Sequence, residues 1–150
     1  MHQDRAIFPF NAGAKGWGLR AAEFIPKGSF IIQYVGEIFN IRSEYGRQKV
    51  LKYSKNICTY LMKLSSKEVI DPTEKGNIAR FINHSCEPNC ITQKWNVLGE
   101  IGVGIFALKD IEPGIELTFD YKFDVYKTPL MRCLCGTPSC KGYLGLKPLE

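Results

Sequence analysis

The sequence predicts a mainly β domain with short helices, followed by a small C-terminal flap that a metal ion holds. The chain has 150 residues, enough for one domain with its own hydrophobic core. Short runs of β-branched and aromatic residues alternate with turns that contain glycine or proline, which is typical of short strands. Beyond Tyr121 the character of the chain changes to a short linker and a cysteine cluster. The pattern therefore indicates a β-rich body and a separate cysteine-bearing segment.

The strand candidates follow one another along the body. The run FIIQYVGEIF at 30–39 follows a Pro-Lys-Gly turn and predicts a strand. Two hairpins and a final strand are predicted further along. The first hairpin pairs 60–64 with 68–70, and the second pairs 91–97 with 101–108 around Gly99. The final strand is predicted at 115–121, after a Pro-Gly turn.

Residues 42–55 are the one convincing helix candidate. Tyr45, Val50 and Leu51 give this segment an uneven apolar face. Gly46 weakens the prediction, because glycine in a helix interior costs about 1 kcal/mol relative to alanine.

The composition excludes several classes of protein. Hydrophobic residues make up 45% of the chain and charged residues 23%, the ordinary balance of a globular domain. There is no run of about 18 apolar residues, so no transmembrane helix and no membrane partner is predicted. Residues 1–10 lack the apolar core and cleavage site of a secretory signal. The net charge of +5 suits either a solvated basic surface or an approach to DNA.

The cysteines indicate a metal site before they indicate disulfides, because they cluster in a chain without a secretion signal. Cys133, Cys135 and Cys140 lie on a segment rich in turn residues and can converge on one tetrahedral ion. Such a site needs a fourth ligand from elsewhere. The alternative is three unrelated reduced thiols. A closed four-thiolate site would be structural and says nothing about a reaction.

A second polar cluster lies at 77–90, where Asn, Arg, His and Cys precede a proline turn. The segment lacks the H-x-E and P-C-x-x-C elements of a zinc deaminase. A cysteine hydrolase could use Cys86, but adjacent residues rarely form a nucleophile and its base. Taken alone, the segment is best interpreted as a polar turn whose side chains cap backbone groups.

Two further segments are weak signals by themselves. The G-x-G of Lys15-Gly16-Trp17-Gly18 permits close backbone approach to a ligand without requiring it. The aromatic residues in 116–121 are more often core than catalytic.

The order in which these motifs occur resembles the SET-domain lysine methyltransferases over about residues 14–146. Asn83-His84-Ser85-Cys86 and the segment ELTFDY at 116–121 are together highly specific for this family. The stretches 90–95 and 140–145 look most like the subgroup that methylates histone H3 at lysine 36. In order along the chain, the motifs that carry the resemblance are Lys15-Gly16-Trp17-Gly18, Tyr34-Val35-Gly36-Glu37, residues 80–89, residues 116–121 and the cysteines at 133, 135 and 140.

The resemblance implies a fold of small curved sheets, the SET-domain β-clip, around a pseudoknot. The segment 83–86 would thread beneath the segment that leads to Tyr121. The SET domain would span 5–123, and a zinc-held post-SET flap would span 124–150.

The resemblance also implies a cofactor, S-adenosylmethionine. Lys15, Gly16 and Trp17 would line it through their backbone, and Asn83 and His84 would hold its adenosine end. Arg80 would hold the crossing in place. The full set of cofactor-binding residues implied in this way is Lys15, Gly16, Trp17, Tyr60, Arg80, Asn83, His84, Met131 and Leu144. By the same resemblance one structural zinc would be bound by Cys86, Cys133, Cys135 and Cys140, which leaves Cys58 and Cys90 as ordinary thiols.

For catalysis the resemblance implies Tyr121 beside the transferring methyl group, Tyr60 as the opposite wall of a lysine channel, and Phe119 at a position that leaves room for more than one methyl group. Methyl transfer to an amine is an in-line displacement, so positioning and electrostatics are the main means of catalysis. The target lysine must be neutral, although its free pKa is about 10.4. An apolar channel beside a cationic cofactor lowers that pKa.

The expected partner is the histone H3 tail on the nucleosome, with a secondary contact to nucleosomal DNA, and the expected location is the nucleus. Three alternatives stay open: a methyltransferase for histone H3 lysine 4 or for a non-histone protein, a non-catalytic SET-like module that binds peptide, and a zinc-binding interaction domain. Relatives of this kind commonly carry a cysteine-rich module upstream. The chain has no cysteine before Cys58, so we expect either a minimal form or a fragment.

Overall fold

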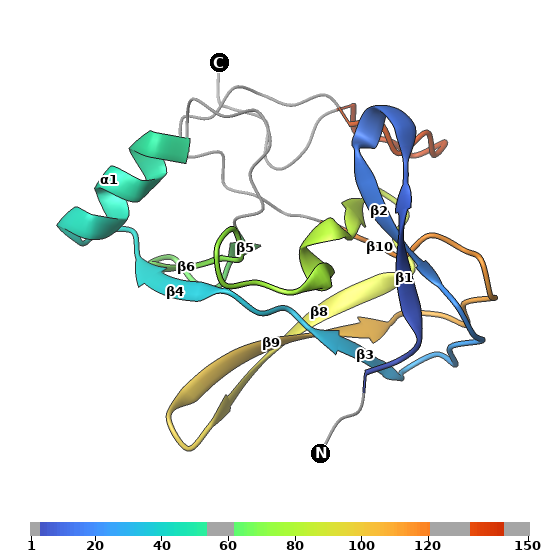
Figure 1. Cartoon of the computed structure of the whole chain (residues 1–150), viewed down its shortest axis with the longest axis horizontal. Helices are drawn as coiled ribbons and strands as arrows, with labels where there is room; N and C mark the ends of the chain where they lie inside the picture. The colour runs from blue at the N-terminus through green and yellow to red at the C-terminus, as the bar shows by residue number, and fades with distance from the viewer. Residues whose placement is uncertain (1–3, 54–61, 121–132, 143–150) are drawn as a thin grey trace.

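The structure is a computed structural model, and it describes residues 4–53, 62–120 and 133–142 (Figure 1). Within these ranges the chain forms small sheets, one α-helix and two short 3-10 helices. The predicted fold class, mainly β with short helices, is therefore confirmed. None of the helices in the described ranges has the length and apolar character needed to cross a membrane.

The first sheet is a hairpin that sequence analysis did not assign. Strand β1 (Ile7–Asn11) pairs antiparallel with β2 (Trp17–Ala21), and the 3-10 helix η1 (Gly13–Lys15) connects them. Gly16 follows η1 with φ +81°, a conformation that glycine adopts without strain. The pattern was missed because Pro9 and the glycines break up the apolar alternation that marks a strand.

The central sheet has the strand order β3-β9-β8 and contains the predicted hairpin at 91–108. Strands β8 (Cys90–Val97) and β9 (Glu100–Ala107) pair antiparallel over their full length, and β3 (Phe30–Gln33) pairs with β9. The turn places Leu98 at φ 53° and Gly99 at φ +83°, so the glycine stands where a left-handed conformation is needed. The hairpin prediction is confirmed.

A third sheet, in the order β4-β6-β5, corrects the prediction of a single strand at 30–39. Strand β4 (Glu37–Asn40) separates from β3 and pairs with β6 (Glu68–Asp71), which also pairs with β5 (Met62–Lys63). The break occurs around Gly36, where an added Cβ would lie 2.8 Å from the carbonyl oxygen of Asp71. The β5–β6 pairing confirms the predicted hairpin, although residues 60 and 61 lie outside the described ranges.

The predicted helix is present as α1 (Glu44–Tyr53). The Ser43 hydroxyl accepts a hydrogen bond of 2.9 Å from the backbone N–H of Gly46, which caps the first turn. An added Cβ on Gly46 would lie 2.0 Å from the carbonyl oxygen of Asn40. The glycine is thus required by the close approach of the helix to the end of β4, and its weak helix propensity is outweighed.

A Gly46→Ala substitution is therefore expected to destabilise the chain by about 1–3 kcal/mol, as overpacking does. Helix propensity alone predicts the opposite, a gain of about 1 kcal/mol. Urea unfolding followed by circular dichroism measures the difference. Gln48→Ala, on the exposed side of the same helix, is the control and should be nearly neutral. A Gly46→Ala variant as stable as the wild type would contradict the steric argument.

Lys49 ties α1 to the third sheet through a buried carboxylate. Its Nζ lies 3.0 Å from Oδ2 of Asp71 and 3.1 Å from Oε1 of Glu37, and the Asp71 side chain is only 1% exposed. Burial favours the neutral amine, but hydrogen bonds, first of all to Asp71, raise the pKa of Lys49 above its ordinary value. The ammonium therefore stays charged and compensates the buried Asp71 carboxylate.

Removal of this ammonium in Lys49→Met is expected to destabilise the chain by about 3 kcal/mol, because it breaks the ion pair with the buried Asp71 carboxylate. Lys67→Met, at an exposed position, is the matched control, with an effect within about 0.5 kcal/mol. Chemical denaturation of both variants makes the comparison. Equal stability of the two variants would show that Lys49 does not compensate the carboxylate.

The segments 83–84 and 118–119 lie side by side although they are far apart in the sequence. Strand β7 (Asn83–His84) follows the 3-10 helix η2 (Ile78–Phe81) and pairs parallel with β10 (Thr118–Phe119). The predicted strand at 115–121 is thus shorter in its described part. Residues 116 and 117 instead contact β2, through the Arg20–Glu116 bridge and the hydrogen bond from Leu117 N–H to the Leu19 carbonyl.

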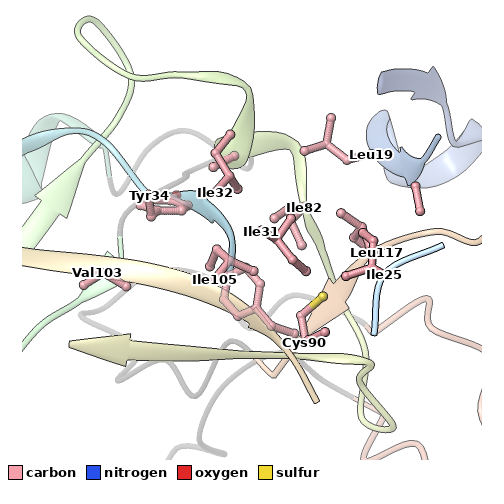
Figure 2. Packing of buried hydrophobic residues seen from close by; sticks show 14 of the residues in the cluster. Leu19, Ile25, Ile31, Ile32, Tyr34, Ile82, Cys90, Val103, Ile105 and Leu117 are labelled. Carbon is pink, nitrogen blue, oxygen red and sulfur yellow. The ribbon is translucent and has the colours of Figure 1, made fainter. Parts of the chain in front are cut away.

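One hydrophobic core joins these small sheets. Figure 2 shows side chains from β2, β3, β8 and β9 meeting those of Ile82 and Leu117. Leu19, Ile31, Ile105 and Leu117 are fully buried. The core therefore packs the segments just before β7 and β10 against the sheets, which fixes where these two strands meet.

Candidate functional site

Four cysteine thiols converge at one point. The sulfur atoms of Cys86, Cys133, Cys135 and Cys140 all lie within 4.8 Å of one another, and those of Cys86 and Cys133 are 3.9 Å apart. Zinc–sulfur bonds of about 2.3 Å in a tetrahedron separate the sulfur atoms by roughly 3.8 Å, so the donor set fits a four-thiolate metal centre. The predicted cysteine cluster is confirmed, and three unrelated thiols are excluded as its interpretation.

Backbone hydrogen bonds hold this cluster together. The N–H of Lys141 donates to Sγ of Cys86 and that of Gly142 to Sγ of Cys140, each at 3.3 Å. The Ser139 hydroxyl donates to Oε1 of Glu87 at 2.6 Å, which adds a direct link from the flap to the body. Such N–H donors stabilise thiolates, the form that binds a metal.

The thiols of the cluster have unequal pKa values. Burial raises the pKa of Cys86 and of Cys133. Burial alone would also raise the pKa of Cys135. Hydrogen bonds, first among them that with the Thr137 hydroxyl, outweigh burial and lower this pKa to about 5. Cys90 is different: it is 1% exposed, lies outside the cluster, and burial raises its pKa to about 12, so it is an ordinary buried thiol as predicted.

His84 adjoins the cluster. Its Nε2 lies 3.3 Å from Sγ of Cys86, and its Nδ1 lies 3.7 Å from Oδ1 of Asp120. Burial lowers the pKa of His84, which favours the neutral imidazole at neutral pH. A metal-bound Cys86 thiolate accepts hydrogen bonds only, so in that state Nε2 must carry the proton. The His84 side chain thus faces the cysteine cluster, whereas its predicted role at the adenosine end stays a prediction.

The Glu116 side chain brings together residues from three of the sequence motifs. The Asn83 amide nitrogen donates to the Trp17 carbonyl at 3.0 Å and to Oε2 of Glu116 at 2.9 Å. Lys15 Nζ lies 2.6 Å from Oε1 of Glu116. The predicted residues Lys15, Trp17 and Asn83 therefore do lie together. Glu116 at their centre was missed, although it opens the ELTFDY segment that sequence analysis singled out.

The turn at Gly16 faces open space beside these residues. A Cβ built on Gly16 would meet no atom of the described chain within 4 Å. The neighbouring Trp17 is 57% exposed, and its ring lies 6.5 Å from that of Phe81, over which Arg80 is stacked at 4.8 Å. Within the described residues, the outer side of the turn at Gly16 is thus uncovered and lies next to the exposed Trp17.

Asn89 holds the segment before β10 in place. Its side chain donates to the Glu116 carbonyl at 2.8 Å and accepts from the Thr118 N–H at 2.9 Å, and the residue is 8% exposed. The Asn77 side chain likewise accepts from the Ala79 N–H at the start of η2. The interpretation of 77–90 as a polar turn that caps backbone groups is therefore correct for these two residues. Other residues of the same segment belong to the cysteine cluster or to strand β7.

The remaining predicted residues are only partly visible. Phe119 is 6% exposed and belongs to the hydrophobic core, where its carbonyl accepts a hydrogen bond from the Ser85 N–H. Its predicted influence on the number of methyl groups is not tested by this contact. Tyr60, Tyr121, Met131 and Leu144 lie outside the described residues. The same is true of the predicted boundary between the two units at 123 and 124.

A sequence-family model for the SET domain matches residues 16–122. The chain is 50% identical over 131 residues to Histone-lysine N-methyltransferase SETD2 of Homo sapiens, which covers 87% of this chain and 5% of that protein. It is 49% identical over 142 residues to ASHH2 of Arabidopsis thaliana, with 94% of this chain and 8% of the relative covered. It is 44% identical over 141 residues to the human protein named Histone-lysine N-methyltransferase, H3 lysine-36 specific, with 93% and 5% covered. The chain thus spans less than a tenth of the length of these relatives.

Proposed function

From the fact that this chain belongs to the SET-domain family, we propose that it is an S-adenosylmethionine-dependent protein-lysine methyltransferase that acts on lysine 36 of histone H3. The observation that carries the proposal is the parallel pairing of β7 with β10. It brings the Asn-His-Ser-Cys segment beside the strand that leads to Tyr121, so that two distant motifs contribute to one site. The relatives named above support the choice of substrate.

The residues of the chain divide the work of this reaction. S-adenosylmethionine, when bound, supplies an electrophilic methyl group. The backbone of Lys15, Gly16 and Trp17 would line the cofactor. The side-chain amide of Asn83 would hydrogen-bond a polar group of the cofactor. Tyr60 and Tyr121 would form the walls of the lysine channel, and such an apolar channel would keep water out and favour the neutral amine. Tyr121 orients that amine toward the methyl group, because an in-line displacement depends on alignment.

We further propose that the ion of the cysteine cluster is zinc. Four thiolates close enough to coordinate one ion tetrahedrally are the ligand set of a structural zinc site. Such a site leaves no position for water and does not take part in catalysis. Because Cys86 belongs to the body and the other three cysteines to the flap, the ion would fasten the flap over the body. Met131 and Leu144 on that flap would then cover the adenine. The proposed units are a SET domain at 5–123 and a post-SET segment at 124–150.

The proposed partner is the nucleosome, and the proposed location is therefore the nucleus. The net charge of +5 opposes binding of a basic histone tail, so a contact with nucleosomal DNA would offset this repulsion. Activity on nucleosomes should then fall steeply with salt, whereas activity on a short peptide should not.

The test is transfer of a labelled methyl group to recombinant nucleosomes with either wild-type histone H3 or a variant in which lysine 36 is replaced by alanine. Signal that is lost only with the variant supports both the reaction and the site. Signal that persists keeps the enzyme but moves the substrate to histone H3 lysine 4 or another protein. Absence of transfer despite cofactor binding would favour a non-catalytic peptide-binding module. Absence of cofactor binding as well would favour a zinc-binding interaction domain.

A further inference from the structure

Glu116 connects three segments that the sequence keeps far apart. Its two carboxylate oxygens are used separately: Oε1 accepts from the Lys15 ammonium at 2.6 Å, and Oε2 accepts from the Asn83 amide at 2.9 Å. Lys15 is 101 positions from Glu116 in the chain, and Asn83 is 33 positions away. A single side chain thus links η1, β7 and the segment before β10.

The carboxylate determines which way the Asn83 amide points. An asparagine amide nitrogen has two hydrogens, and here one is donated to the Trp17 carbonyl and the other to Glu116. Both of these partners are acceptors only. If the amide were turned over, its oxygen would face two acceptors, so that orientation is excluded. The Asn83 oxygen must therefore lie on the side away from Glu116.

Glu116 also neutralises Lys15. The two side chains are 24% and 21% exposed, so the ion pair is shielded from much of the solvent. With its ammonium engaged, Lys15 presents no unpaired positive charge to a cationic cofactor, and like charges would otherwise repel. The Lys15 side chain thereby acts as the counter-ion of Glu116, and its backbone remains available beside the turn at Gly16.

The surroundings are built to admit this carboxylate. A Cβ on Gly18 would lie 2.8 Å from Oε2 of Glu116 and 3.0 Å from the Asn83 amide nitrogen, so a larger residue there would displace these two side chains from their present positions. The Asn89 side chain holds the Glu116 carbonyl at 2.8 Å, which fixes the backbone from which the carboxylate extends. The Glu116 side chain is thus constrained from both ends.

We propose that Glu116 is a positioning residue for cofactor binding: it orients the Asn83 amide so that its oxygen can accept a hydrogen bond from the cofactor, and it holds Lys15 as a counter-ion. This inference rests on the proposed function, because it assumes that Asn83 faces the cofactor. Glu116 acts through Asn83 and Lys15 and does not itself take part in the methyl transfer.

A Glu116→Gln variant preserves the shape of the side chain and creates a specific conflict. The Gln amide has one acceptor and one donor end, so its NH2 must face either the Lys15 ammonium or the Asn83 NH2. One of the two hydrogen bonds is then lost, because two N–H donors face each other. We expect the affinity for S-adenosylhomocysteine, measured by calorimetry, to fall about 10- to 100-fold, as for the loss of a hydrogen bond to a charged group. The KM for the cofactor should rise more than kcat falls, because the chemistry itself is left intact.

The double variant Lys15→Met with Glu116→Gln separates positioning from simple loss of structure. Without the ammonium, the Gln oxygen can accept from Asn83 and its NH2 can turn toward the position of the removed charge. Cofactor affinity should recover to within about threefold of the Lys15→Met single variant. Glu112→Gln, at an exposed carboxylate four positions earlier in the chain, is the matched control and should bind like the wild type. If Glu116→Gln also binds like the wild type, or if the double variant shows no recovery, the inference is wrong.

A second readout does not depend on the cofactor. The two side-chain amide protons of Asn83, observed by ¹⁵N NMR, should be protected from exchange in the free wild-type chain. They should lose protection in Glu116→Gln and regain it in the double variant. If the wild type binds no S-adenosylhomocysteine, the proposed function fails, and the amide protons still decide whether Glu116 orients Asn83. If these protons exchange equally in wild type and Glu116→Gln, the orienting role is refuted whatever the cofactor result.

Discussion

A Cys86→Ser variant is expected to lose the metal ion and, with it, the attachment of the C-terminal flap. Among the described residues, Cys86 is the one cysteine of the cluster that lies outside 133–142, and its sulfur lies 3.9 Å from that of Cys133. A serine hydroxyl is a much poorer zinc ligand than a thiolate. The loss of affinity should therefore exceed the 10- to 100-fold that accompanies mutation of an outer-shell partner. Because metal binding contributes directly to folding of such sites, the melting temperature should fall too.

Native mass spectrometry and competition with a chromogenic chelator measure this loss. The wild-type chain should carry one zinc ion, and Cys86→Ser should carry none after brief exposure to the chelator. Cys90→Ala is the matched control, because Cys90 is buried outside the cluster and should keep the zinc. Zinc that survives in Cys86→Ser would mean that body and flap do not share the site.

A Tyr121→Phe variant is expected to lower the rate of methyl transfer about 100-fold or more, the range in which a positioned catalytic side chain contributes. Tyr121 follows Asp120, which lies beside His84 and within 3.9 Å of Lys141 on the flap. Body and flap thus meet at this point in the chain. The substitution removes only a hydroxyl, so cofactor affinity and stability should change little, and the loss should appear in kcat.

Single-turnover methylation of a histone H3 peptide, with cofactor binding measured in parallel, tests this expectation. Tyr45→Phe provides the matched control: it removes a tyrosine hydroxyl that donates to Glu37, in the ion-pair cluster around Lys49. That variant should methylate at the wild-type rate. Undiminished transfer by Tyr121→Phe would refute its assignment as the catalytic residue.

Local sequence was enough to predict the elements whose partners are neighbours in the chain. The β8–β9 hairpin and the β5–β6 hairpin were predicted because each is closed by a short turn, and the turn residue Gly99 has the left-handed conformation that glycine favours. The helix was predicted to within two residues at each end from its apolar spacing. The three clustered cysteines on the flap indicated a metal site for the same reason: their ligand atoms are close in sequence as well as in space.

Residues that meet only after folding could not be found in this way. Spacing indicated that a fourth ligand was needed, but Cys86 was identified through the family resemblance, because no local pattern links it to Cys133, 47 positions away. The β3–β4 break at Gly36 depends on contact with Asp71, which the run at 30–39 does not reveal.

What the sequence determined by itself was the fold class, the local hairpins and helix, and the chemical nature of the ligands. What only the tertiary structure decided was which of these groups share a site. Glu116 was part of a recognised motif, yet its partners became visible only when β7 and β10 were paired and Lys15 lay within 2.6 Å of its carboxylate. The physical reason is that periodicity and turn chemistry report interactions over a few residues, whereas packing of one core brings together side chains a hundred residues apart.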